Sequence, residues 1–587
     1  MEKWILKNPK NDFKKMSLTL GVSELICRVL VNRNIIDYDI AKRFINPSLS
    51  GLYDGRQIKD LEKGVSIIKN KIKTDKKIRI IGDYDVDGVI STFILYKALT
   101  RCGANVDYVI PHRIFDGYGI NNSIVEKANE DGIDTIITCD NGISAIEQIK
   151  YAKELGISVI VTDHHEVPFI EDENLNRIHI TPEADAIIDV KQVDCKYPFK
   201  LLCGAGVVFK FIQVLYQEMG ISSKEETAFH EFVAIATVCD VVDLKGENRI
   251  LVKNGLAVIG ESTNIGLNAL MEQTGIIGKE IGVYHLGFII GPCINASGRL
   301  DWAVKGLKLL LCTDRTEAVS LAQELCNLNA ERKNMTILGV EETIETIENS
   351  DLKNDKVLVV YKPHLHESIA GIIAGKVRER YNVPTFILTD SENGVKGSGR
   401  SIEEYNMFEG LLECKELLTR FGGHPMAAGF SLESENVDVL RKQLNNFSTL
   451  TEDDLITKVY IDARIPISDI NIKTADELMI LEPFGKGNAK PIFAEKGICV
   501  NRGNVLGSNR NVLKLRLLTN NKQYLDCIFF GNINDFDTYI VEKFGEKELD
   551  RMYAGQINNI KLDLVFNIDV NEYNGNRSVQ LVLKYYR

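Results

Sequence analysis

The side chains with the clearest capacity for chemistry are carboxylates and imidazoles in three short motifs. They are Asp83, Asp85 and Asp87 in D-Y-D-V-D-G, Asp140 in T-C-D-N-G, and His164 and His165 in T-D-H-H-E. The carboxylates of the first motif repel one another unless cations neutralise them, so the motif predicts a metal site. Oxygen-rich ligands with one or two imidazoles favour Mn²⁺ or Mg²⁺ over zinc, and so many carboxylates suit two ions. Two ions that share a hydroxide would hydrolyse a phosphoester or phosphoanhydride.

Other roles are open when each motif is taken by itself. D-Y-D-V-D-G matches the start of an EF-hand calcium loop, but position 12 of that loop needs a bidentate Glu and holds Ile94 here. The loop also needs a preceding helix, whereas residues 76–82 have the pattern of a strand. One aspartate would suffice to cap a helix, and Asp140 alone could be a turn or cap residue. Of the two histidines, one could bind metal through a neutral nitrogen while the other meets a substrate phosphate or a second ion.

The elements that carry these motifs have the pattern of a parallel sheet. Short apolar strands are predicted at 76–82, 105–111, 134–142 and 158–166, separated by amphipathic helices. Strands this apolar are typical of a sheet covered by helices on both faces. Three of the strands end at the motifs, and ligands gather beyond the carboxyl ends of parallel strands. We therefore expect the acids and histidines to meet at one edge of the sheet.

The rest of the chain predicts a second lobe and a barrel. Residues 205–345 are expected to be mainly helical, and a second α/β unit follows, with a helix over E-G-L-L-E-C-K-E-L-L-T-R-F-G-G (409–423). After residue 451, short alternating segments joined by Asn/Gly turns predict a small antiparallel barrel of the oligonucleotide-binding (OB) type. The expected fold is α/β: two α/β lobes joined by a long helix, plus a C-terminal OB-like β-barrel. The expected divisions are a helical segment at 1–50, the first lobe at 51–320, the connecting helix at 321–345, the second lobe at 346–450 and the barrel at 451–587.

The composition limits the classes of protein that fit. The 587 residues are 44% hydrophobic and 26% charged, so well-packed domains can form. A net charge of −12 excludes a polybasic coat, so nucleic acid would need a local basic patch. The start lacks the apolar stretch of a signal peptide, and no window of about 18 apolar residues predicts a membrane span. Twelve cysteines without a CxxC argue against a zinc ribbon or a disulfide framework, so reduced thiols in the cytoplasm are expected.

In this order and spacing, the three motifs resemble those of the DHH phosphoesterase superfamily. Further motifs resemble the RecJ family of single-stranded-DNA-specific 5′→3′ exonucleases within it. They are L-C-G-A-G-V (202–207), A-T-V-C-D-V-V (236–242), G-P-C-I-N-A-S-G-R (291–299), K-G-S-G-R-S (396–401), F-G-G-H-P (421–425) and L-E-P-F-G-K-G-N (481–488). The resemblance covers most of the chain. It implies a metal-dependent exonuclease that hydrolyses phosphodiester bonds by a two-metal mechanism, in DNA repair and recombination.

The resemblance also assigns residues to the metal site. It implies the ligands Asp85, Asp87, Asp140, His164 and Asp240, with Asp83 as a further ligand or a close neighbour of one. Catalysis is expected from His165, Asp140 and Asp85, with His165 beside the reacting phosphate. Asp240 rests on the resemblance alone, because in A-T-V-C-D-V-V it would otherwise be taken for an acid at a helix end.

A second set of residues is expected to bind the substrate. K-G-S-G-R-S offers backbone N–H groups, a hydroxyl and a guanidinium, which suit a phosphate, although a glycine hairpin with a surface arginine has the same pattern. F-G-G-H-P could likewise be the glycine stop of a helix. By resemblance, these elements face the metal site and hold the terminal phosphate of the substrate. The residues expected in this role are Arg113, Asn295, Arg299, Ser398, Arg400, Gly423 and His424.

A terminal phosphate at a fixed distance from the metals would explain exonuclease action. Only the phosphodiester one nucleotide inward would then reach the ions, and a narrow cleft would demand single strands. The chain departs from the family pattern at Cys293, where Arg is usual, and at Val512, near a barrel position that is often His. If the usual Arg touches DNA, this chain should bind DNA less tightly there or use a neighbour such as Arg299.

The barrel region is the one part of the chain without an acidic surplus. From residue 455 onward there are 18 basic and 16 acidic residues, against 52 and 66 upstream. Between residues 485 and 522, eight residues are Lys or Arg and only Glu495 is acidic. A basic groove can follow a sugar–phosphate backbone, although charged runs are usually only solvated.

We therefore expect single-stranded DNA with a 5′ end as the substrate, a helicase and a single-strand-binding protein as partners, no membrane, and a monomer. The first alternative is another DHH hydrolase, acting on short oligoribonucleotides, cyclic dinucleotides or polyphosphate, but those relatives generally lack a barrel. The second is a catalytically silent scaffold, which predicts lost acids, whereas every metal position is intact here.

Overall fold

The chain folds into two compact units. The structure, a computed structural model, describes residues 2–171, 176–392, 394–507, 510–573 and 575–587. The first unit comprises residues 52–242 and 254–457, and the second comprises 2–51, 243–253 and 458–587. The expected fold class is confirmed, with α/β lobes in the first unit and a barrel in the second. Among the described residues, no helix is long and apolar enough to cross a membrane.

The first lobe is built on a five-stranded sheet in the order β3-β2-β4-β5-β8. Its strands are β2 (Lys77–Ile81), β3 (Asn105–Val109), β4 (Thr135–Cys139), β5 (Ser158–Asp163) and β8 (Ala186–Asp189). All neighbouring strands are parallel, as their apolar runs predict. The carboxyl ends of β2, β4 and β5 therefore share one edge, and each ends at one of the three motifs.

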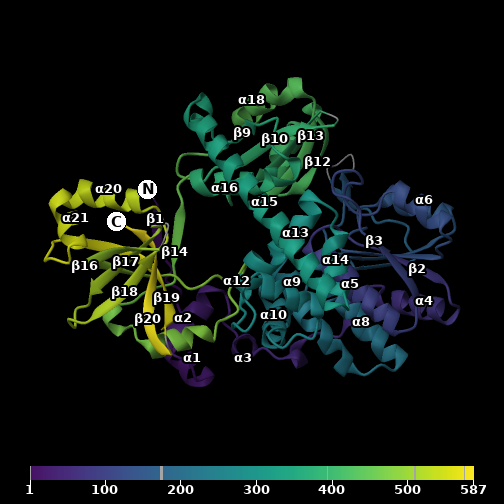
Figure 1. The fold of residues 1–587 in the computed structure, drawn as a ribbon, viewed down its shortest axis with the longest axis horizontal. Coiled ribbons are helices and arrows are strands. Elements are labelled where there is room, and N and C mark those ends of the chain that lie inside the picture. The colour runs from purple at the N-terminus through teal and green to yellow at the C-terminus, as the bar shows by residue number, and fades with distance from the viewer. Residues whose placement is uncertain (1, 172–175, 393, 508–509, 574) are drawn as a thin grey trace. The chain divides into compact units, whose positions relative to one another are not determined.

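Helices cover both faces of this sheet (Figure 1). On one face, α6 (Asn122–Glu130) and α7 (Ile146–Glu154) pack apolar residues such as Val125 and Ile149 against the strands. The other face carries α4 (Leu61–Lys73), α5 (Val86–Arg101) and α8 (Gly204–Met219). Helix α5 is buried along most of its length, as an apolar sequence all round a helix predicts.

A group of helices follows the first sheet and leads to the second lobe, and residues 246–253 among them belong to the second unit. They are α9 (His230–Cys239), α10 (Gly246–Ile259), α11 (Ile265–Gln273), α12 (Val283–His285), α13 (Gly291–Leu300) and α14 (Val304–Leu311), with a π-helical turn at Leu286–Ile290. The connecting helix α15 (Arg315–Glu348) is longer than the predicted 321–345. It starts where the Asp314 side chain accepts a hydrogen bond from the backbone N–H of Glu317.

The second lobe has a mixed sheet in the order β12-β13-β11-β10-β9. Its elements are β9 (Leu358–Tyr361), α16 (Glu367–Tyr381), β10 (Thr385–Ser391), β11 (Gly394–Arg400), α17 (Met407–Leu412), β12 (Leu418–His424), β13 (Ala427–Leu432) and α18 (Val437–Phe447). The helix predicted over 409–423 is wrong, because α17 ends at Leu412 and residues 418–424 form β12. The backbone groups of β12 pair with β13, with Phe421 opposite Phe430. This pairing outweighs the helical preference of E-C-K-E-L-L.

The second unit contains a closed five-stranded barrel. Its strands are β16 (Phe493–Leu506), β17 (Val512–Leu518), β18 (Tyr524–Phe529), β19 (Lys561–Tyr573) and β20 (Asn576–Tyr586). The order is β16-β17-β18-β20-β19, and pairing of β19 with β16 closes it. The short strand β15 (Ala463–Arg464) pairs in parallel with β16. Three helices of this unit did not stand out in the sequence: α19 (Ile472–Met479), α20 (Ile533–Phe544) and α21 (Glu546–Tyr553).

The N-terminal segment belongs to the same unit as the barrel. It consists of β1 (Lys3–Leu6), α1 (Phe13–Leu20), α2 (Glu24–Asn32) and α3 (Tyr38–Ile45). Ile26 and Leu30 of α2 share a core with barrel residues such as Leu515 and Phe566. The segment was predicted to be helical throughout, but β1 pairs in parallel with β14 (Lys458–Ile461).

Candidate active site

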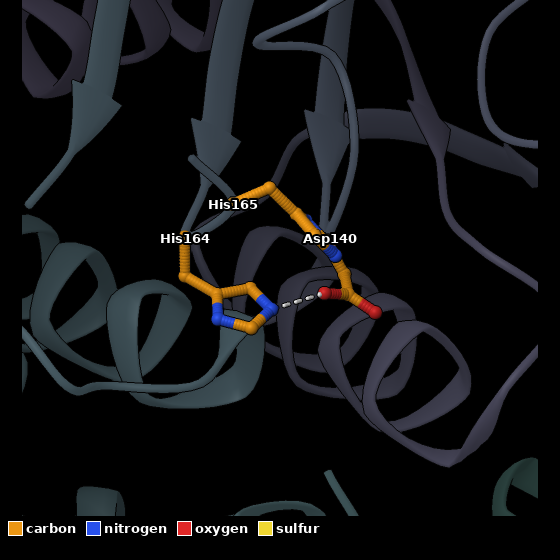
Figure 2. Close-up of side chains that lie close together, drawn as sticks. All are labelled: Asp140, His164 and His165. Carbon is orange, nitrogen blue, oxygen red and sulfur yellow. Dashed lines mark ion pairs between the residues drawn. The ribbon is translucent and has the colours of Figure 1, made fainter. Parts of the chain in front are cut away.

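The acids and histidines of the motifs meet at the carboxyl edge of the first sheet. Their ligand-capable atoms form three overlapping groups, each within 4.8 Å: Asp83, Asp85 and Asp140; Asp87, His164 and Asp240; and Asp140, His164 and His165. Figure 2 shows the His164 ring directed at the Asp140 carboxylate across the gap between two strand ends. The structure thus brings together every residue that the sequence predicted for the metal site, although they span residues 83 to 240.

Local structure explains how these carboxylates are held. Asp140 adopts a left-handed backbone with φ of 61°, and the Asn141 side chain donates to the carbonyls of Ile81 (3.0 Å) and Cys139 (2.9 Å). Asp87 belongs to the first turn of α5. Its carboxylate lies at the N-terminus of α8, where it accepts hydrogen bonds from the N–H groups of Gly204 (2.6 Å) and Ala205 (2.8 Å). A Cβ at position 204 would lie 2.8 Å from Asp140, so the glycine of L-C-G-A-G-V is needed there.

The acid cluster has the properties of a divalent-cation site. Burial, reinforced by neighbouring carboxylates, raises the pKa of Asp83, Asp140 and Asp240 well above the usual value and that of Asp87 to about 6. Buried atoms that find no hydrogen-bond partner among the described residues include Asp83 Oδ1, Asp140 Oδ1, His164 Nε2 and Asp240 Oδ2. Such atoms are costly unless something binds them. Oxygen and imidazole donors in this number fit Mn²⁺ or Mg²⁺.

His164 is oriented as a metal ligand. Its ring hydrogen-bonds to the Leu202 carbonyl, and burial followed by the charge on His165 lowers its pKa to about 3, so it is neutral. Nε2 lies 3.0 Å from Asp140 Oδ1 and 3.7 Å from Asp87 Oδ2. Because the other nitrogen serves Leu202, Nε2 presents a lone pair to these carboxylates. That arrangement is repulsive unless a cation lies between them.

His165 has the opposite protonation state. Burial would lower its pKa, but the Asp163 carboxylate, with Oδ1 2.7 Å from His165 Nδ1, raises that pKa to about 9. Although burial opposes it, the His165 charge holds the pKa of Asp163 below its usual range. The Tyr118 hydroxyl donates to the Asp140 carbonyl (2.8 Å) and lies 3.2 Å from His165 Nδ1. The sequence placed Asp163 at this strand end together with the histidines of T-D-H-H-E, but gave it no role of its own.

A cavity of about 340 Å³ adjoins the acid cluster. Tyr84, which lies between Asp83 and Asp85 in the chain, forms part of its wall. The charged and hydroxyl side chains that line it are those of Tyr84, Arg113, Glu367, Ser368, Thr389, Lys396, Ser398, Arg420 and Ser431, and Lys396 forms an ion pair with Glu367 (2.7 Å). Arg113 stacks over the Tyr84 ring at 4.4 Å. These groups suit a phosphate.

Two further predicted residues contribute from beside this cavity. Arg299 donates to the Ser368 carbonyl (2.5 Å), and burial followed by the charges of Arg113 and Arg332 lowers its pKa to about 9. Arg400 donates to the Gly399 carbonyl (2.7 Å), and burial followed by Arg113 lowers its pKa. The arginines are therefore close enough to feel one another, which favours an anion between them.

Other predicted residues lie outside the cavity wall. Asn295 accepts the N–H of Val86 (3.2 Å) and so holds the start of α5. Gly423 and His424 are exposed at the end of β12, whereas Arg420 and Phe421 of the same strand line the cavity. Lys396 begins the motif K-G-S-G-R-S but was given no role in the sequence analysis, and Arg420 was not singled out there. Cys293 is buried on α13, where its sulfur accepts a hydrogen bond from Asn329 Nδ2 of α15 (3.4 Å).

Comparison with known proteins agrees with this geometry. Family models match in three places: DHH family, N-terminal domain, at 77–237; DHHA1 domain at 354–449; and RecJ OB domain at 461–585. The single-stranded-DNA-specific exonuclease RecJ of Bacillus subtilis is 34% identical, over 99% of this chain and 70% of its own length. The chain belongs to the RecJ family. RecJ of Escherichia coli is 31% identical, over 91% of this chain and 92% of its own length.

A solved RecJ structure has the same fold. RecJ of Thermus thermophilus in complex with Mn²⁺ matches with a TM-score of 0.81 and 26% identity, over 100% of this chain and 79% of that one. The RecJ membership expected from the motifs is thus confirmed, as is the class of enzyme, a metal-dependent exonuclease of the DHH type. Mn²⁺ or Mg²⁺ is confirmed as the cofactor of RecJ, and the acids and histidine described above fit either ion.

Proposed function

We propose that this RecJ-family chain degrades single-stranded DNA from its 5′ end by a mechanism that uses two divalent cations. The observation that carries this proposal is the position of the basic cavity directly beside the buried acid cluster. Tyr84 joins the two, because it follows Asp83 in the chain and lines the cavity. A phosphate held in the cavity would present the next phosphodiester to the acids.

The residues that would hold the cations are Asp83, Asp85, Asp87, Asp140, His164 and Asp240. When bound, the cations would activate water for attack on phosphorus and neutralise charge on the displaced oxygen. The chain contributes orientation. Gly204 and Ala205 fix the Asp87 carboxylate, and the Leu202 carbonyl fixes the tautomer of His164.

His165 would act on the reacting phosphate. At neutral pH its ring carries a proton, because its pKa is about 9. Since Nδ1 is bound to Asp163, Nε2–H is the group that can donate to a phosphate oxygen or to the departing 3′ oxygen. Asp163 holds the ring in place, as the buried acid does for histidine in other hydrolases. Loss of either residue should therefore slow hydrolysis.

The basic cavity would set the polarity of degradation. Arg113, Ser398 and Arg420 would bind a 5′-terminal phosphate, with Arg299 and Arg400 adding positive charge nearby. With the end of the strand anchored there, only the first internal phosphodiester would lie at the acids. This arrangement would release nucleotides one at a time from the 5′ end.

The barrel of the second unit would bind the strand. Arg502 of β16 and Arg516 of β17 stand directly opposite each other, and both are exposed. Like charges in this position destabilise a sheet unless an anion lies between them. The Arg516 guanidinium also stacks over the Tyr524 ring at 4.6 Å, and Tyr524 is half exposed. Paired arginines beside an aromatic ring suit the backbone and bases of single-stranded DNA.

In the cell, we propose a role in DNA repair and recombination, in the cytoplasm and as a monomer. An enzyme restricted to single strands needs a source of them, which is the product of a helicase. A single-strand-binding protein would occupy the same substrate. Both are therefore the partners that we propose.

The decisive assay compares substrates end-labelled at either terminus: single-stranded DNA, duplex DNA, RNA and polyphosphate, each with Mn²⁺ or EDTA. We expect mononucleotides to appear first from the 5′ end of single-stranded DNA, with no release in EDTA. Release from the 3′ end would contradict the proposed polarity. Preference for polyphosphate would favour the small-phosphate alternative, and no hydrolysis of any substrate would favour the scaffold.

A further inference from the structure

Three aromatic rings from two distant segments pack together in the first unit. His112 stacks on Phe115, with ring centroids 4.5 Å apart at 25°, and contacts Trp302 edge-on at 4.6 Å. His112 is buried, whereas Phe115 is 72% exposed and Trp302 is 47% exposed. Phe115 and Trp302 thus present aromatic surface to solvent, and the buried His112 ring packs against both.

Hydrogen bonds hold the His112 ring and the backbone on either side of the two exposed rings. His112 Nδ1 accepts the N–H groups of Ile114 (3.2 Å) and Phe115 (3.3 Å), and the His112 N–H donates to Asp116 Oδ2 (2.7 Å). The backbone N–H of Trp302 donates to Asp301 Oδ1 (2.7 Å). Residues 112–116 therefore form a closed turn that sets the direction of Phe115. A ligand that stacks on preset rings loses little additional entropy in ordering them.

The aromatic cluster lies next to the arginines of the candidate active site. Arg113, which directly follows His112, lines the basic cavity and stacks over Tyr84. Arg299 lies in the last turn of α13, three residues before Trp302 in the chain. The two guanidinium groups are close enough for Arg113 to lower the pKa of Arg299. Apolar aromatic surface and positively charged side chains are therefore close together.

This combination points to one kind of ligand. An apolar peptide would bind the rings but gain nothing from the arginines, and a simple anion would leave the rings exposed. A nucleotide has both a flat π-face and a phosphate. We propose that Phe115 and Trp302, supported by His112, form a platform on which a nucleobase of the bound strand stacks while its phosphates meet Arg113 and Arg299. This inference rests on the proposed function and assigns a base-binding subsite to it.

The platform would also select for unpaired bases. In a duplex both faces of a base are stacked on neighbouring pairs, so a base can meet Phe115 only if it leaves the stack. Every base has a π-face, so the platform would tolerate any sequence. Single-strand specificity would then arise at this subsite, in addition to any limit that the width of the cleft imposes.

Trp302 provides a direct test. The chain has two tryptophans, so Trp4→Phe leaves Trp302 as the single tryptophan reporter. We would titrate this variant in EDTA, where cleavage is prevented, with a 5′-phosphorylated oligodeoxynucleotide. A series with one abasic site moved along the first nucleotides would locate the stacked base. We expect the intact strand to quench Trp302 fluorescence, and one abasic position to abolish the quenching.

Substitutions at Phe115 give the second measurement. Phe115→Ala should raise the Kd for the intact strand about 5- to 100-fold, the range for loss of one base stack. It should leave the Kd for the strand with that one abasic site unchanged, and Phe115→Tyr should restore tight binding. The matched control is Phe288→Ala, which removes another exposed ring (65%) that stacks on Tyr284.

The outcomes separate the platform from the proposed function. Unchanged Trp302 fluorescence at saturating DNA, or an equal loss of affinity for intact and abasic strands in Phe115→Ala, would overturn the platform while the exonuclease stands. If neither the Trp4→Phe chain nor the unsubstituted chain bound or cleaved single-stranded DNA with Mn²⁺, the proposed function itself would fail, and the platform with it.

Discussion

Asp163 Oδ1 lies 2.7 Å from His165 Nδ1, and this contact decides the charge of a ring at the edge of the acid cluster. The Asp163 carboxylate also accepts the backbone N–H groups of His164 (2.7 Å) and Ile143 (2.9 Å). It therefore holds both the histidine motif and the loop after β4. His165 is protonated because of Asp163, while His164, one residue earlier, is neutral.

Asp163→Asn should lower kcat by about 10- to 100-fold, the usual cost of losing a residue that orients a group at a metal site. The amide keeps the size of the carboxylate but cannot stabilise the imidazolium of His165. We expect KM and Mn²⁺ affinity to change little. Asp163 does not line the substrate cavity, and it contacts the ligand His164 only through the backbone N–H of that residue. Steady-state kinetics would measure kcat and KM, and calorimetry would measure the Mn²⁺ affinity. Asp194→Asn, which removes a surface ion pair with Lys59, is the control; a fall in KM alone would contradict this role.

Asp140→Asn should have effects of opposite sign on stability with and without metal. In EDTA the variant should melt at a higher temperature than the unsubstituted chain, because one buried, like-charged carboxylate is gone. In Mn²⁺ the unsubstituted chain should gain about 2.7 kcal/mol at 100 times Kd, and the variant much less. Thermal denaturation in both conditions measures this. An equal Mn²⁺-induced shift in both proteins would show that Asp140 does not hold the ion.

Arg420→Ala should reduce the preference for a 5′-phosphorylated end. A hydrogen bond to a charged group contributes about 1.5–3 kcal/mol, so kcat/KM for the phosphorylated strand should fall about 10- to 100-fold. The strand with a 5′-hydroxyl should be affected much less. Competition between the two strands measures the ratio. Lys415→Ala, an exposed cation nearby in sequence, is the control; an unchanged ratio in Arg420→Ala would move the phosphate site elsewhere.

Glu231 makes the stability of the first lobe depend on pH. Burial raises its pKa to about 7, against the hydrogen bond from Ser262 (2.6 Å). Because the folded pKa is above the unfolded value, the stabilisation is complete below the unfolded pKa and is lost as pH rises through about 7. Glu231→Gln has no charge to bury. Its melting temperature should exceed that of the unsubstituted chain at pH 8 by an amount equivalent to about 2 kcal/mol, but not at pH 5. A difference that does not vary with pH would contradict the assignment.

Arg516→Ala should reduce the salt dependence of DNA binding. Each phosphate contact on a single strand contributes about 0.7 to the slope of log K against log salt, so the slope should fall by about that amount. Binding to a long oligonucleotide would be measured by fluorescence anisotropy at several salt concentrations. The control is Arg551→Ala, which removes an equal charge from α21, where Arg551 pairs with Glu548. The same change of slope in both variants would indicate a general charge effect and not a contact at Arg516.

Local pattern was enough to predict four of the five strands of the first sheet, though not β8, and the position of its motifs. The strands before Asp83, Asp140 and His164 are apolar on both sides, which is a property of neighbouring residues alone. Parallel strands joined by helices must all end at one edge, so the meeting of these residues follows from topology without any knowledge of packing. The barrel was predictable for the same reason, because its strands alternate and end at turn residues.

The segment 409–423 shows where local pattern fails. Its first half is helical and its second half is a strand, although the sequence reads as one amphipathic helix. The choice was made by β13, which offers β12 a partner for its backbone hydrogen bonds. That partner, which begins three residues after β12 ends, lies outside the segment that reads as a helix. The helix expectation also gave no reason to place Arg420 at the cavity wall.

By itself, then, the amino-acid order predicted the strands that carry the motifs, and hence that carboxylates and imidazoles would converge. Only the tertiary structure decided what each of them touches. It set the proton on His165 and its absence on His164, brought Arg420 to the cavity wall, packed the N-terminal helices into the core of the barrel, and placed Phe115 beside Trp302. The reason is physical: pKa values and contacts depend on burial and on neighbours that are far away in the chain, which a local pattern does not encode.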